Sequence, residues 1–499
     1  MTSHDDEVLV VGAGMAGLFA ALSLAPTGRR ILVLERDGPP PEGDADQAFE
    51  TWHRRGVGHL RHSHAFLARL RTVIRDEHPQ LLADLMAAGC REIGFSDMLT
   101  EQHKPAYRPE PEDADLVILT SRRTTLELVM RRYVERLPNV ELRPGVWARR
   151  LLLEDGPPPK VRGVLAETAE GEVEIPATVV VDAAGRTSQL VEQLIEAGAA
   201  IEEESETAGI LYFTRHYRLR PGASEPPRGK RPASGDLGYL KFGVFPGDGG
   251  CFSITIAVPE IEMELRQSIV RPETFDAVCR EMPGLVPWLA PDVSEPVSKV
   301  FGMGDLHSRW REFAPRGEAA AYGFFPMGDA LVRTNPLYGR GCSFAAVQAG
   351  LLRTALDETS FPGERLTTYA RLIREELRPY YLDMRRQDRA AIRRARQALT
   401  PGHRATLRSK MLKSFAEDGV AIAVRSDVAL MRAAMRGFHM LEHPSAWLKR
   451  PENMAKVLRH WATPRAAKAD AYPLKPGPAR SELMAAVGLD ASADLLPAA

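Results

Sequence analysis

Residues 7–35 decide the fold, and they read EVLVVGAGMAGLFAALSLAPTGRRILVLE. The run Glu7–Val11 is rich in β-branched residues and predicts a buried parallel strand. The glycine-rich turn at residues 12–17 leads into residues 18–24, which have the composition of a helix. Arg30–Glu35 predicts a second strand that ends on an acid. This order of elements is the dinucleotide-binding fingerprint, which by itself does not distinguish FAD from NAD.

Each glycine of that fingerprint, and the acid after it, has a physical role. Gly12 permits the tight turn, Gly14 lets the backbone approach a pyrophosphate, and Gly17 lets the helix pack closely on the strand. The helix N-terminus offers free N–H donors and partial positive charge to the phosphates. Glu35 is expected to accept hydrogen bonds from the hydroxyl groups of the adenosine ribose.

Two later segments carry further motifs. Residues 178–188, TVVVDAAGRTS, predict another buried strand that ends in a glycine turn. Residues 319–330, AAAYGFFPMGDA, lead into NPLYGRGCS at 335–343 and then into an alanine-rich helix at 344–356.

On GAGMAG (12–17), SRRTTLE (121–127), VVVDAAGRTS (179–188) and GDA followed by NPLYGRG (328–341), the chain resembles the p-hydroxybenzoate hydroxylase-like FAD-dependent monooxygenases. It is most similar to their bacterial epoxidase and hydroxylase members, over roughly residues 7–400. The resemblance implies that FAD is the cofactor. It also implies that Asp329 binds the ribityl chain, that Arg123 lies beside the pyrophosphate, and that residues 339–342 present helix N-terminal amides to the isoalloxazine ring.

The candidate site follows from these motifs. The candidate cofactor-binding residues are Gly12, Gly14, Met15, Ala16, Gly17, Glu35, Arg36, Arg123, Val146, Asp182, Gly328, Asp329, Pro336, Gly339, Arg340, Gly341 and Cys342. The candidate catalytic residues are His62, His64 and Tyr338, and no metal site is expected. Cys342 is expected to be structural, because no second cysteine lies near it in the sequence.

The segment GVGHLRHSHAFL at residues 56–67 is expected to open a helix that runs toward Ile74. His62 and His64 are two residues apart and do not face each other on a helix, so they are not expected to share a metal. Two interpretations stay open for them. One histidine faces the isoalloxazine ring, or both are bonded to the backbone at the start of the helix.

Two departures from the family pattern bear on the reaction. Asp182-Ala183-Ala184 replaces the Asp-Gly dipeptide that helps the aromatic hydroxylases bind NADPH, and no second complete GxGxxG follows. The electron donor is therefore expected to be NADPH or NADH, used either directly or through a separate flavin reductase. The WxWxIP signature of tryptophan-type halogenases is absent, which makes halogenation a weaker alternative.

The rest of the chain predicts an α/β fold with additions. Residues 201–310 alternate in the manner of an antiparallel sheet, and residues 366–458 are helical in pattern. Aromatic residues on that sheet suggest an apolar substrate, and the tail from Tyr472 suggests a loosely packed terminus. We expect a Rossmann-like FAD-binding domain of the GR2 type (1–200 and 311–362), an inserted antiparallel substrate domain (201–310) and a helical C-terminal region (363–499).

Composition limits the partners. The 499 residues carry 65 Lys and Arg against 66 Asp and Glu, so the chain has no overall attraction to nucleic acid. The apolar run at residues 8–25 follows an acidic segment, not the basic one of a signal peptide. We therefore expect a cytoplasmic protein without stable membrane insertion. The sequence does not indicate an oligomeric state.

The expected function is insertion of one oxygen atom from O2 into an apolar, electron-rich small molecule, by hydroxylation or epoxidation, in secondary metabolism. One alternative is an FAD-dependent reductase or dehydrogenase of an unsaturated, isoprenoid-like substrate. Flavin-dependent halogenation is a second. A flavin-bound binding partner or redox sensor, whose basic segment at residues 384–413 meets an anionic macromolecule, is a third.

Overall fold

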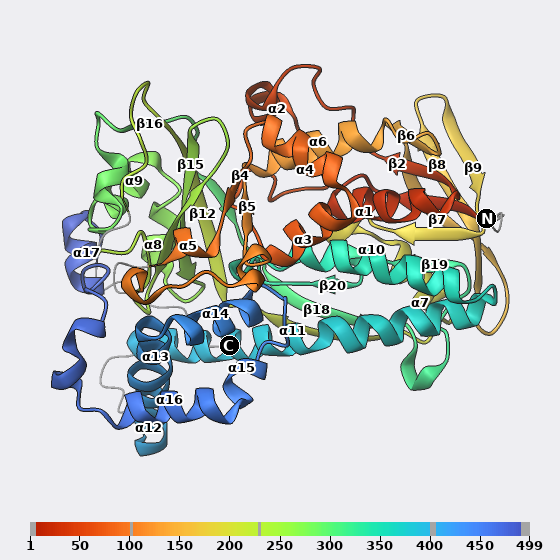
Figure 1. The fold of residues 1–499 in the computed structure, drawn as a ribbon. Helices are drawn as coiled ribbons and strands as arrows, with labels where there is room; N and C mark the ends of the chain where they lie inside the picture. The colour runs from red at the N-terminus through yellow and green to blue at the C-terminus, as the bar shows by residue number, and fades with distance from the viewer. Residues whose placement is uncertain (1–5, 100–102, 228–230, 400–405, 491–499) are drawn as a thin grey trace.

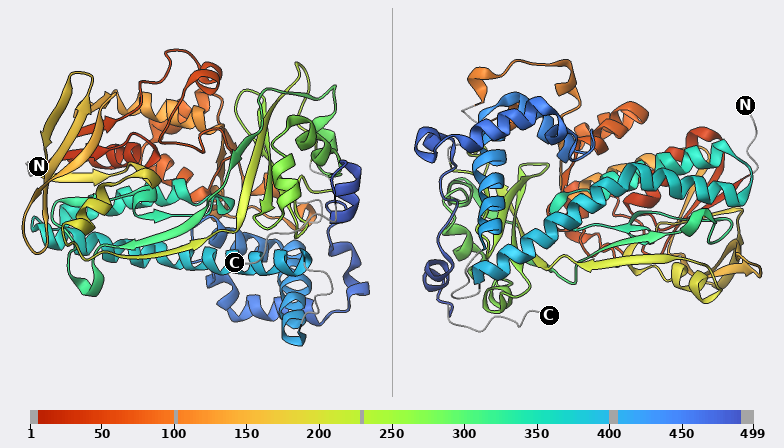
Figure 2. Two further views of the ribbon diagram at one scale, coloured as in Figure 1. Left: turned by 180° about the vertical axis from the view of Figure 1, so that it is seen from behind. Right: turned by 90° about the horizontal axis from the view of Figure 1, so that it is seen from below.

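The computed structural model describes residues 6–99, 103–227, 231–399 and 406–490. Figure 1 shows a parallel sheet toward one end of the molecule and an antiparallel sheet toward the other. The long helix α11 (Pro362–Leu399) runs beneath both and ends among the C-terminal helices, as the right-hand view of Figure 2, seen from below, also shows.

The parallel sheet has the strand order β19-β10-β1-β2-β6, and every neighbouring pair in it is parallel. Its strands are β1 (Glu7–Val11), β2 (Arg30–Glu35), β6 (Val140–Pro144), β10 (Val179–Asp182) and β19 (Phe324–Pro326). The strands expected at the fingerprint and at residues 178–182 are therefore confirmed. The strand β19 lies far along the chain from β1 and β10. The GDA motif after β19 therefore reaches the same edge of the sheet as the turns after β1 and β10 only when the chain folds.

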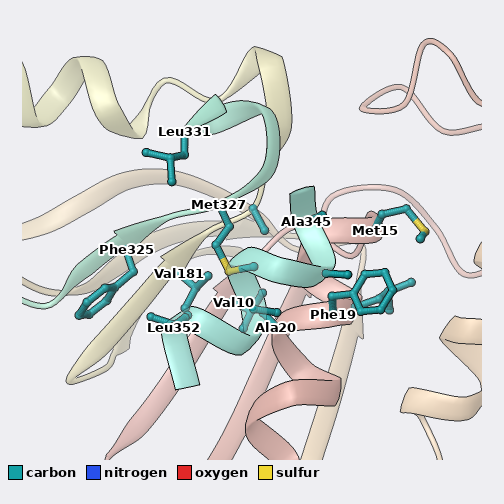
Figure 3. Packing of buried hydrophobic residues seen from close by; sticks show 14 of the residues in the cluster. Val10, Met15, Phe19, Ala20, Val181, Phe325, Met327, Leu331, Ala345 and Leu352 are labelled. Carbon is teal, nitrogen blue, oxygen red and sulfur yellow. The ribbon is translucent and has the colours of Figure 1, made fainter. Parts of the chain in front are cut away.

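Two helices cover this sheet and pack on each other. They are α1 (Met15–Leu24) and α10 (Gly341–Glu358). Figure 3 shows their side chains, among them Phe19 and Leu352, packed with Val10 and Val181 of the strands. The hydroxyl of Ser23 on α1 donates to the carbonyl of Ala349 on α10 across 3.1 Å. Burial of this apolar layer holds the N-termini of both helices at the same end of the sheet.

The expected antiparallel sheet is confirmed. Its order is β13-β14-β15-β12-β16, with β17 also paired to β12. The strands are β12 (Ile210–Leu219), β13 (Ser234–Asp236), β14 (Lys241–Pro246), β15 (Cys251–Pro259), β16 (Ser294–Pro296) and β17 (Phe301–Met303). Its aromatic residues Phe213, Tyr217 and Phe252 pack into the core of this part of the chain. Most of the aromatic side chains that suggested an apolar substrate are thus used for packing.

A third sheet joins the two parts to α11. It consists of β11 (Glu202–Thr207), β18 (His307–Glu312) and β20 (Val332–Arg333). Glu206 on β11 accepts hydrogen bonds from Arg385 at 2.8 Å and from Arg389 at 2.6 Å, both on α11. Glu204 binds Arg385 as well. The basic face of α11 is therefore paired with an acidic strand over this stretch.

Two smaller sheets complete the strands. They are β3 (Ala65–Phe66), β4 (Arg91–Ile93) and β5 (Ile118–Thr120), and β7 (Trp147–Glu154), β8 (Lys160–Thr168) and β9 (Gly171–Pro176). The expectation of a helix beginning at residues 56–67 is wrong, because α3 (Ala68–Glu77) starts only at Ala68. Gly56 and Gly58 favour turns, and β3 takes up the end of the segment by pairing with β5.

The C-terminal part is helical, as expected. The remaining helices of the chain are α2 (Ala45–Thr51), α4 (Pro79–Ala87), α5 (Phe95–Met98), α6 (Arg123–Val134), α7 (Leu190–Glu196), α8 (Met263–Ser268), α9 (Pro272–Arg280), α12 (Leu407–Ser414), α13 (Ile422–Ser426), α14 (Val428–Phe438), α15 (Ala446–Lys449), α16 (Pro451–Ala462) and α17 (Arg480–Ala486). The expectation of a loose tail is wrong for α17, because Leu483 and Met484 are fully buried in the core of the antiparallel sheet.

Among the described residues, no helix combines the length and the apolar character needed to cross a bilayer. The three domain boundaries expected above stay predictions.

Candidate active site

The glycine turn between β1 and α1 is shaped for a phosphate group. A Cβ atom on Gly12, whose φ is +100°, would lie 2.7 Å from the carbonyl oxygen of Ala183, and one on Gly17 would lie 1.8 Å from the carbonyl oxygen of Gly12. Both positions therefore require glycine for packing. A Cβ atom on Gly14 would instead have no described atom within 4 Å. This face of the turn is open, as a bound pyrophosphate would require.

The first turns of α1 and α10 are free to bind a ligand. Within the described residues, no side chain caps either N-terminus, and neither first turn contains an acid. Both helices therefore present N–H donors and partial positive charge toward the same region. Met15 and Ala16 lie in the first turn of α1, and a Cβ atom on Gly328 would meet that of Ala16 at 2.8 Å. This contact brings the GDA motif against the start of α1.

Glu35 is buried at the end of β2 and holds the glycine turn. Its carboxylate accepts hydrogen bonds from the backbone N–H of Ala13 and of Asp37, each at 2.9 Å, and from Arg54 at 2.6 Å. The backbone N–H of Val146 donates to the carbonyl of Glu35 at 3.0 Å. Val146 therefore lies beside the carboxyl end of β2, where the adenosine is expected. Arg36 lies next to Gly56.

Sequence reasoning missed Arg54, which is buried and donates hydrogen bonds to two carboxylates. Its other terminal nitrogen lies 2.8 Å from Glu127, and Glu127 also binds Arg123 at 2.8 Å. The two arginines hold the pKa of the Glu127 carboxyl below its usual value despite its burial. Arg54 had no signal in the sequence, because its partners are distant in the chain.

Arg123 is the first residue of α6, and its side chain reaches the start of α10. Its Nη1 donates to Sγ of Cys342 at 3.0 Å and is 3.5 Å from Nε2 of His64. Arg123 therefore joins the start of α10 to His64, and its expected place beside the cofactor pyrophosphate stays a prediction. Burial raises the pKa of the Cys342 thiol, against the effect of Arg123, so the thiol stays protonated at neutral pH.

Asp329 follows β19 and is half-buried. Its carboxylate accepts no hydrogen bond from any residue that the structure describes. Burial raises the pKa of this carboxyl, and the positive charges of Arg333, Arg309 and Arg123 oppose that rise. A half-buried carboxylate that lacks a donor favours a ligand with hydroxyl groups at this position.

Asp182 ends β10 and is fully buried. Its carboxylate accepts hydrogen bonds from the backbone N–H of Ala184 at 3.1 Å and from the hydroxyl of Ser188 at 2.7 Å. Burial raises the pKa of Asp182 to about 6. Through these two hydrogen bonds, the Asp182 carboxylate holds in place the loop at Ala183 and Ala184, which packs against Gly12.

The NPLYGRG loop presents its backbone to the site and its side chains elsewhere. Gly339 has a φ of +63°, which lets the chain turn from Pro336 into α10. The Arg340 side chain is turned to α11, where it donates to the carbonyl of Tyr380 at 2.6 Å. The hydroxyl of Tyr338 also faces α11. The backbone N–H groups of Gly341 and Cys342, in the first turn of α10, can therefore donate hydrogen bonds to the expected flavin ring.

The Tyr338 hydroxyl belongs to a buried network. It donates to Asp388 at 2.9 Å, and the Asn335 amide donates to the same carboxylate oxygen at 2.8 Å. The hydroxyl of Tyr212 donates to Asn335 at 2.8 Å. Tyr338 is thus a link between the loop and α11, and no contact joins its hydroxyl to the histidines in the described structure.

The two candidate histidines have different environments. Nδ1 of His62 lies 3.0 Å from the hydroxyl of Thr214 on the antiparallel sheet, and burial lowers the pKa of His62 to about 4. Nδ1 of His64 lies 2.9 Å from the carbonyl of His62, which leaves Nε2 toward Arg123. Burial also lowers the pKa of His64 well below its usual value. Both imidazoles are therefore neutral at pH 7. The described residues contain no group of His, Cys, Asp and Glu suited to a metal ion.

An open pocket adjoins these histidines, and its empty space of about 220 Å³ includes open solvent. It lies between residues 62–64, the start of α6 and the antiparallel sheet. Its lining residues are His62, Ser63, His64, Ser121, Arg122, His216, Phe245, Pro246, Gly247, Phe252 and Ser253. His64 is common to this pocket and to the group around Arg123 and Cys342. Sequence reasoning missed His216, although its place in the alternating pattern of a strand puts it on one face with Thr214.

The sequence is similar to those of known proteins. Residues 7–228 match the family model described as "FAD dependent oxidoreductase". Protein Rv3254 of Mycobacterium tuberculosis is 30% identical over 387 residues, which cover 70% of this chain and 73% of that protein.

Solved structures share the fold at low identity. The myxobacterial chondrochloren halogenase CndH is 18% identical, with a TM-score of 0.58 over 89% of this chain and 96% of that one. The p-nitrophenol 4-monooxygenase PnpA of Pseudomonas putida DLL-E4 is 18% identical, with a TM-score of 0.57 over 87% of this chain and 98% of that one. These similarities establish the fold. The type of reaction has to be inferred from the residues of the site.

Proposed function

The chain belongs to the FAD-dependent oxidoreductase family, and on this premise we propose that it is a monooxygenase. It inserts one oxygen atom from O2 into an electron-rich small molecule, by hydroxylation or epoxidation. The observation that carries the proposal is the pocket beside His64, which adjoins the group where the isoalloxazine ring is expected. A substrate in that pocket lies next to the expected redox centre.

When bound, FAD supplies the redox chemistry and the activation of O2. The chain supplies binding and orientation. The open face at Gly14 and the N-terminus of α1 hold the pyrophosphate, and the unpartnered carboxylate of Asp329 accepts from ribityl hydroxyl groups. The free amides at the start of α10 would favour negative charge on the flavin ring when it is bound.

The neutral histidines fit this assignment. The imidazoles of His62 and His64 carry no charge at neutral pH, because burial lowers their pKa values. They therefore neither attract nor repel a charged group strongly. Arg123 keeps its guanidinium against the first turn of α10 and is itself neutralised in part by Glu127. The site therefore orients a substrate and directs the positive end of one helix dipole toward the expected ring. Its described residues form no acid–base pair, and the proposed oxygen insertion does not require one.

We propose that the electron donor is NADPH or NADH, used directly or through a separate flavin reductase, and that the substrate belongs to secondary metabolism. The sequence has Asp182-Ala183-Ala184 in place of the Asp-Gly dipeptide that helps the aromatic hydroxylases bind NADPH. This difference favours reduction of the flavin by a separate reductase. The substrate carries an apolar, electron-rich skeleton, because Phe245, Pro246 and Phe252 contribute to the pocket wall.

The test is isotopic. The FAD-loaded protein receives NADPH or NADH, with and without an added flavin reductase, and a panel of phenols and alkenes under oxygen-18 gas. A monooxygenase yields product that contains one labelled oxygen atom per molecule, detected by mass spectrometry. Oxygen uptake that produces only hydrogen peroxide with every compound would contradict the proposal.

The same assay separates the alternatives. A product that carries chlorine or bromine, formed only when the halide is present, identifies halogenation. A product that gains hydrogen and forms without oxygen identifies a reductase. A flavin that responds to none of the small molecules favours the binding partner or redox sensor.

A further inference from the structure

The tautomer of His216 is determined by its surroundings. His216 lies on β12, is buried, and places Nε2 3.0 Å from the carbonyl oxygen of Arg61. A carbonyl oxygen only accepts, so Nε2 carries the proton and Nδ1 has a free lone pair. Burial lowers the pKa of His216 to about 4, which keeps the ring neutral at pH 7.

Nδ1 of His216 is a buried acceptor that finds no donor in the described part of the chain. The ring is held in place by edge contacts with Phe49 at 4.7 Å and Phe301 at 6.3 Å between centroids. It therefore cannot easily turn toward another donor. A buried acceptor of this kind is destabilising unless a ligand or water donates to it, and His216 lines the pocket.

Ser253 is the cross-strand neighbour of His216. The two residues are directly paired between β12 and β15, and Thr214 pairs with Thr255 two positions away. Paired residues share one face of the sheet, with side chains close enough to contact a common atom. This polar face is turned to the pocket and to residues 62–64, whereas the alternate residues of the same strands form the apolar core.

A chain of hydroxyl groups ends at Ser253. Thr255 lies 2.7 Å from Thr214 and donates to Ser63 at 2.7 Å, and Ser63 lies 2.6 Å from Ser253. Ser63 and Ser253 have one proton each but share a single hydrogen bond. One of the two protons is therefore left for a ligand in the pocket. The pocket wall thus offers a donor beside the free acceptor of His216.

We propose that this pair recognises a hydroxyl group of the substrate. The hydroxyl donates its proton to Nδ1 of His216 and accepts a hydrogen bond from the serine pair at Ser253. A hydroxyl is the smallest group that both donates and accepts, which matches the two unsatisfied groups on the wall. The inference rests on the proposed function only for the assignment of this pocket to the substrate.

The same wall disfavours a carboxylate. An ionised carboxylate cannot donate to Nδ1 of His216. Arg122 is the cation of the pocket, but Asp248 holds it through contacts of 2.6 Å and 3.1 Å. Its charge is therefore neutralised by a buried partner. The class of substrate is a neutral molecule that carries a hydroxyl on an apolar skeleton.

The test compares the binding of two neutral probes, 2-naphthol and 2-methoxynaphthalene, to the oxidised, FAD-loaded protein without any electron donor. Calorimetric titration gives the dissociation constants. We expect the wild type to bind 2-naphthol roughly tenfold more tightly than the methyl ether, as one charge-neutral hydrogen bond allows. We expect 2-naphthoate to bind more weakly than 2-naphthol.

Two substitutions at one position isolate the acceptor. His216→Gln keeps a donor for the carbonyl of Arg61 but has no acceptor at the position of Nδ1, so the tenfold preference falls to about one. His216→Asn places an amide oxygen near that position and keeps the preference. His439→Gln is the matched control, because Nδ1 of His439 is also buried without a partner among the described residues but lies outside the pocket lining.

Equal preference in the wild type and in His216→Gln would overturn the inference, as would failure of both neutral probes to bind. Flavin absorbance and the melting temperature verify that each variant is folded and loaded. Because no reductant is present, the binding result is independent of whether the protein inserts oxygen, so failure of the proposed function is distinguishable from failure of this inference.

Discussion

Nη1 of Arg123 donates a hydrogen bond to Sγ of Cys342 across 3.0 Å, which joins the first residue of α6 to the first turn of α10. From Arg123 the buried ion pairs continue through Glu127 and Arg54 to Glu35, which holds the backbone of Ala13. A continuous set of charged side chains thus connects the two helix N-termini that face the expected cofactor.

The first prediction concerns this connection. Arg123→Met removes one of the two cations that neutralise Glu127 and leaves a buried carboxylate partly unpaired. We expect the free energy of unfolding to fall by about 3 kcal/mol, measured by denaturant titration of the apoprotein. Cys342→Ala, which removes a weak acceptor and leaves the ion pairs intact, is expected to cost less than about 1 kcal/mol. Similar losses in the two variants would contradict the assigned role of Arg123.

The second prediction separates packing from ligand binding within the glycine turn. Gly17→Ala forces a Cβ against the carbonyl of Gly12 and is expected to destabilise the apoprotein by roughly 3 kcal/mol or more. Gly14→Ala meets no described atom, so the melting temperature of the apoprotein stays close to that of the wild type. Its Cβ occupies the space expected for the pyrophosphate, and FAD affinity falls at least about tenfold. Fluorescence titration with FAD measures the affinity. Unchanged affinity in Gly14→Ala would place the cofactor elsewhere.

The third prediction concerns Asp329. Asp329→Asn removes a charge that has no hydrogen-bond donor among the described residues, so the apoprotein is expected to be at least as stable as the wild type. FAD binding loses a charged acceptor for ribityl hydroxyls, which corresponds to about 2 kcal/mol, or roughly thirtyfold in affinity. Thermal unfolding and FAD titration give the two quantities on the same sample. A variant that loses stability but binds FAD normally would assign Asp329 a purely structural role.

The fourth prediction is a pH dependence at Asp388. Burial raises the pKa of this carboxyl from 3.8 to about 6, so the folded protein binds the proton more tightly than the unfolded chain. The contribution of Asp388 to the free energy of unfolding therefore falls as the pH rises from about 4 to about 6 and is constant above that range.

Asp388→Asn removes this contribution while its amide oxygen still accepts from Asn335 and Tyr338. The difference in unfolding free energy, variant minus wild type, is expected to increase by on the order of 2 kcal/mol between pH 4 and pH 6. Denaturant titrations at a series of pH values measure it, and other carboxyl groups cancel in the difference. A difference that does not change with pH would show that the pKa of Asp388 is close to its usual value.

Local pattern was sufficient for the parts of this protein whose structure depends on neighbouring residues. The strands β1, β2 and β10 follow from runs of β-branched residues, and the glycine turn follows from steric needs at Gly12 and Gly17. The antiparallel sheet followed from alternation with a period of two. The segment at residues 56–67 was misinterpreted, since its turns and the pairing of β3 with β5 depend on a distant strand.

The sequence by itself therefore determined the cofactor-binding fold and the family, because glycine spacing and strand periodicity are properties of consecutive residues. Only the tertiary structure decided which side chains meet. Arg54 reaches Glu35 and Glu127, Tyr338 turns to Asp388, and α17 returns to the antiparallel sheet. The pairing of His216 with Ser253 is of the same kind. Such contacts join residues far apart in the chain, and their geometry depends on sheet register and helix packing, which no local pattern specifies.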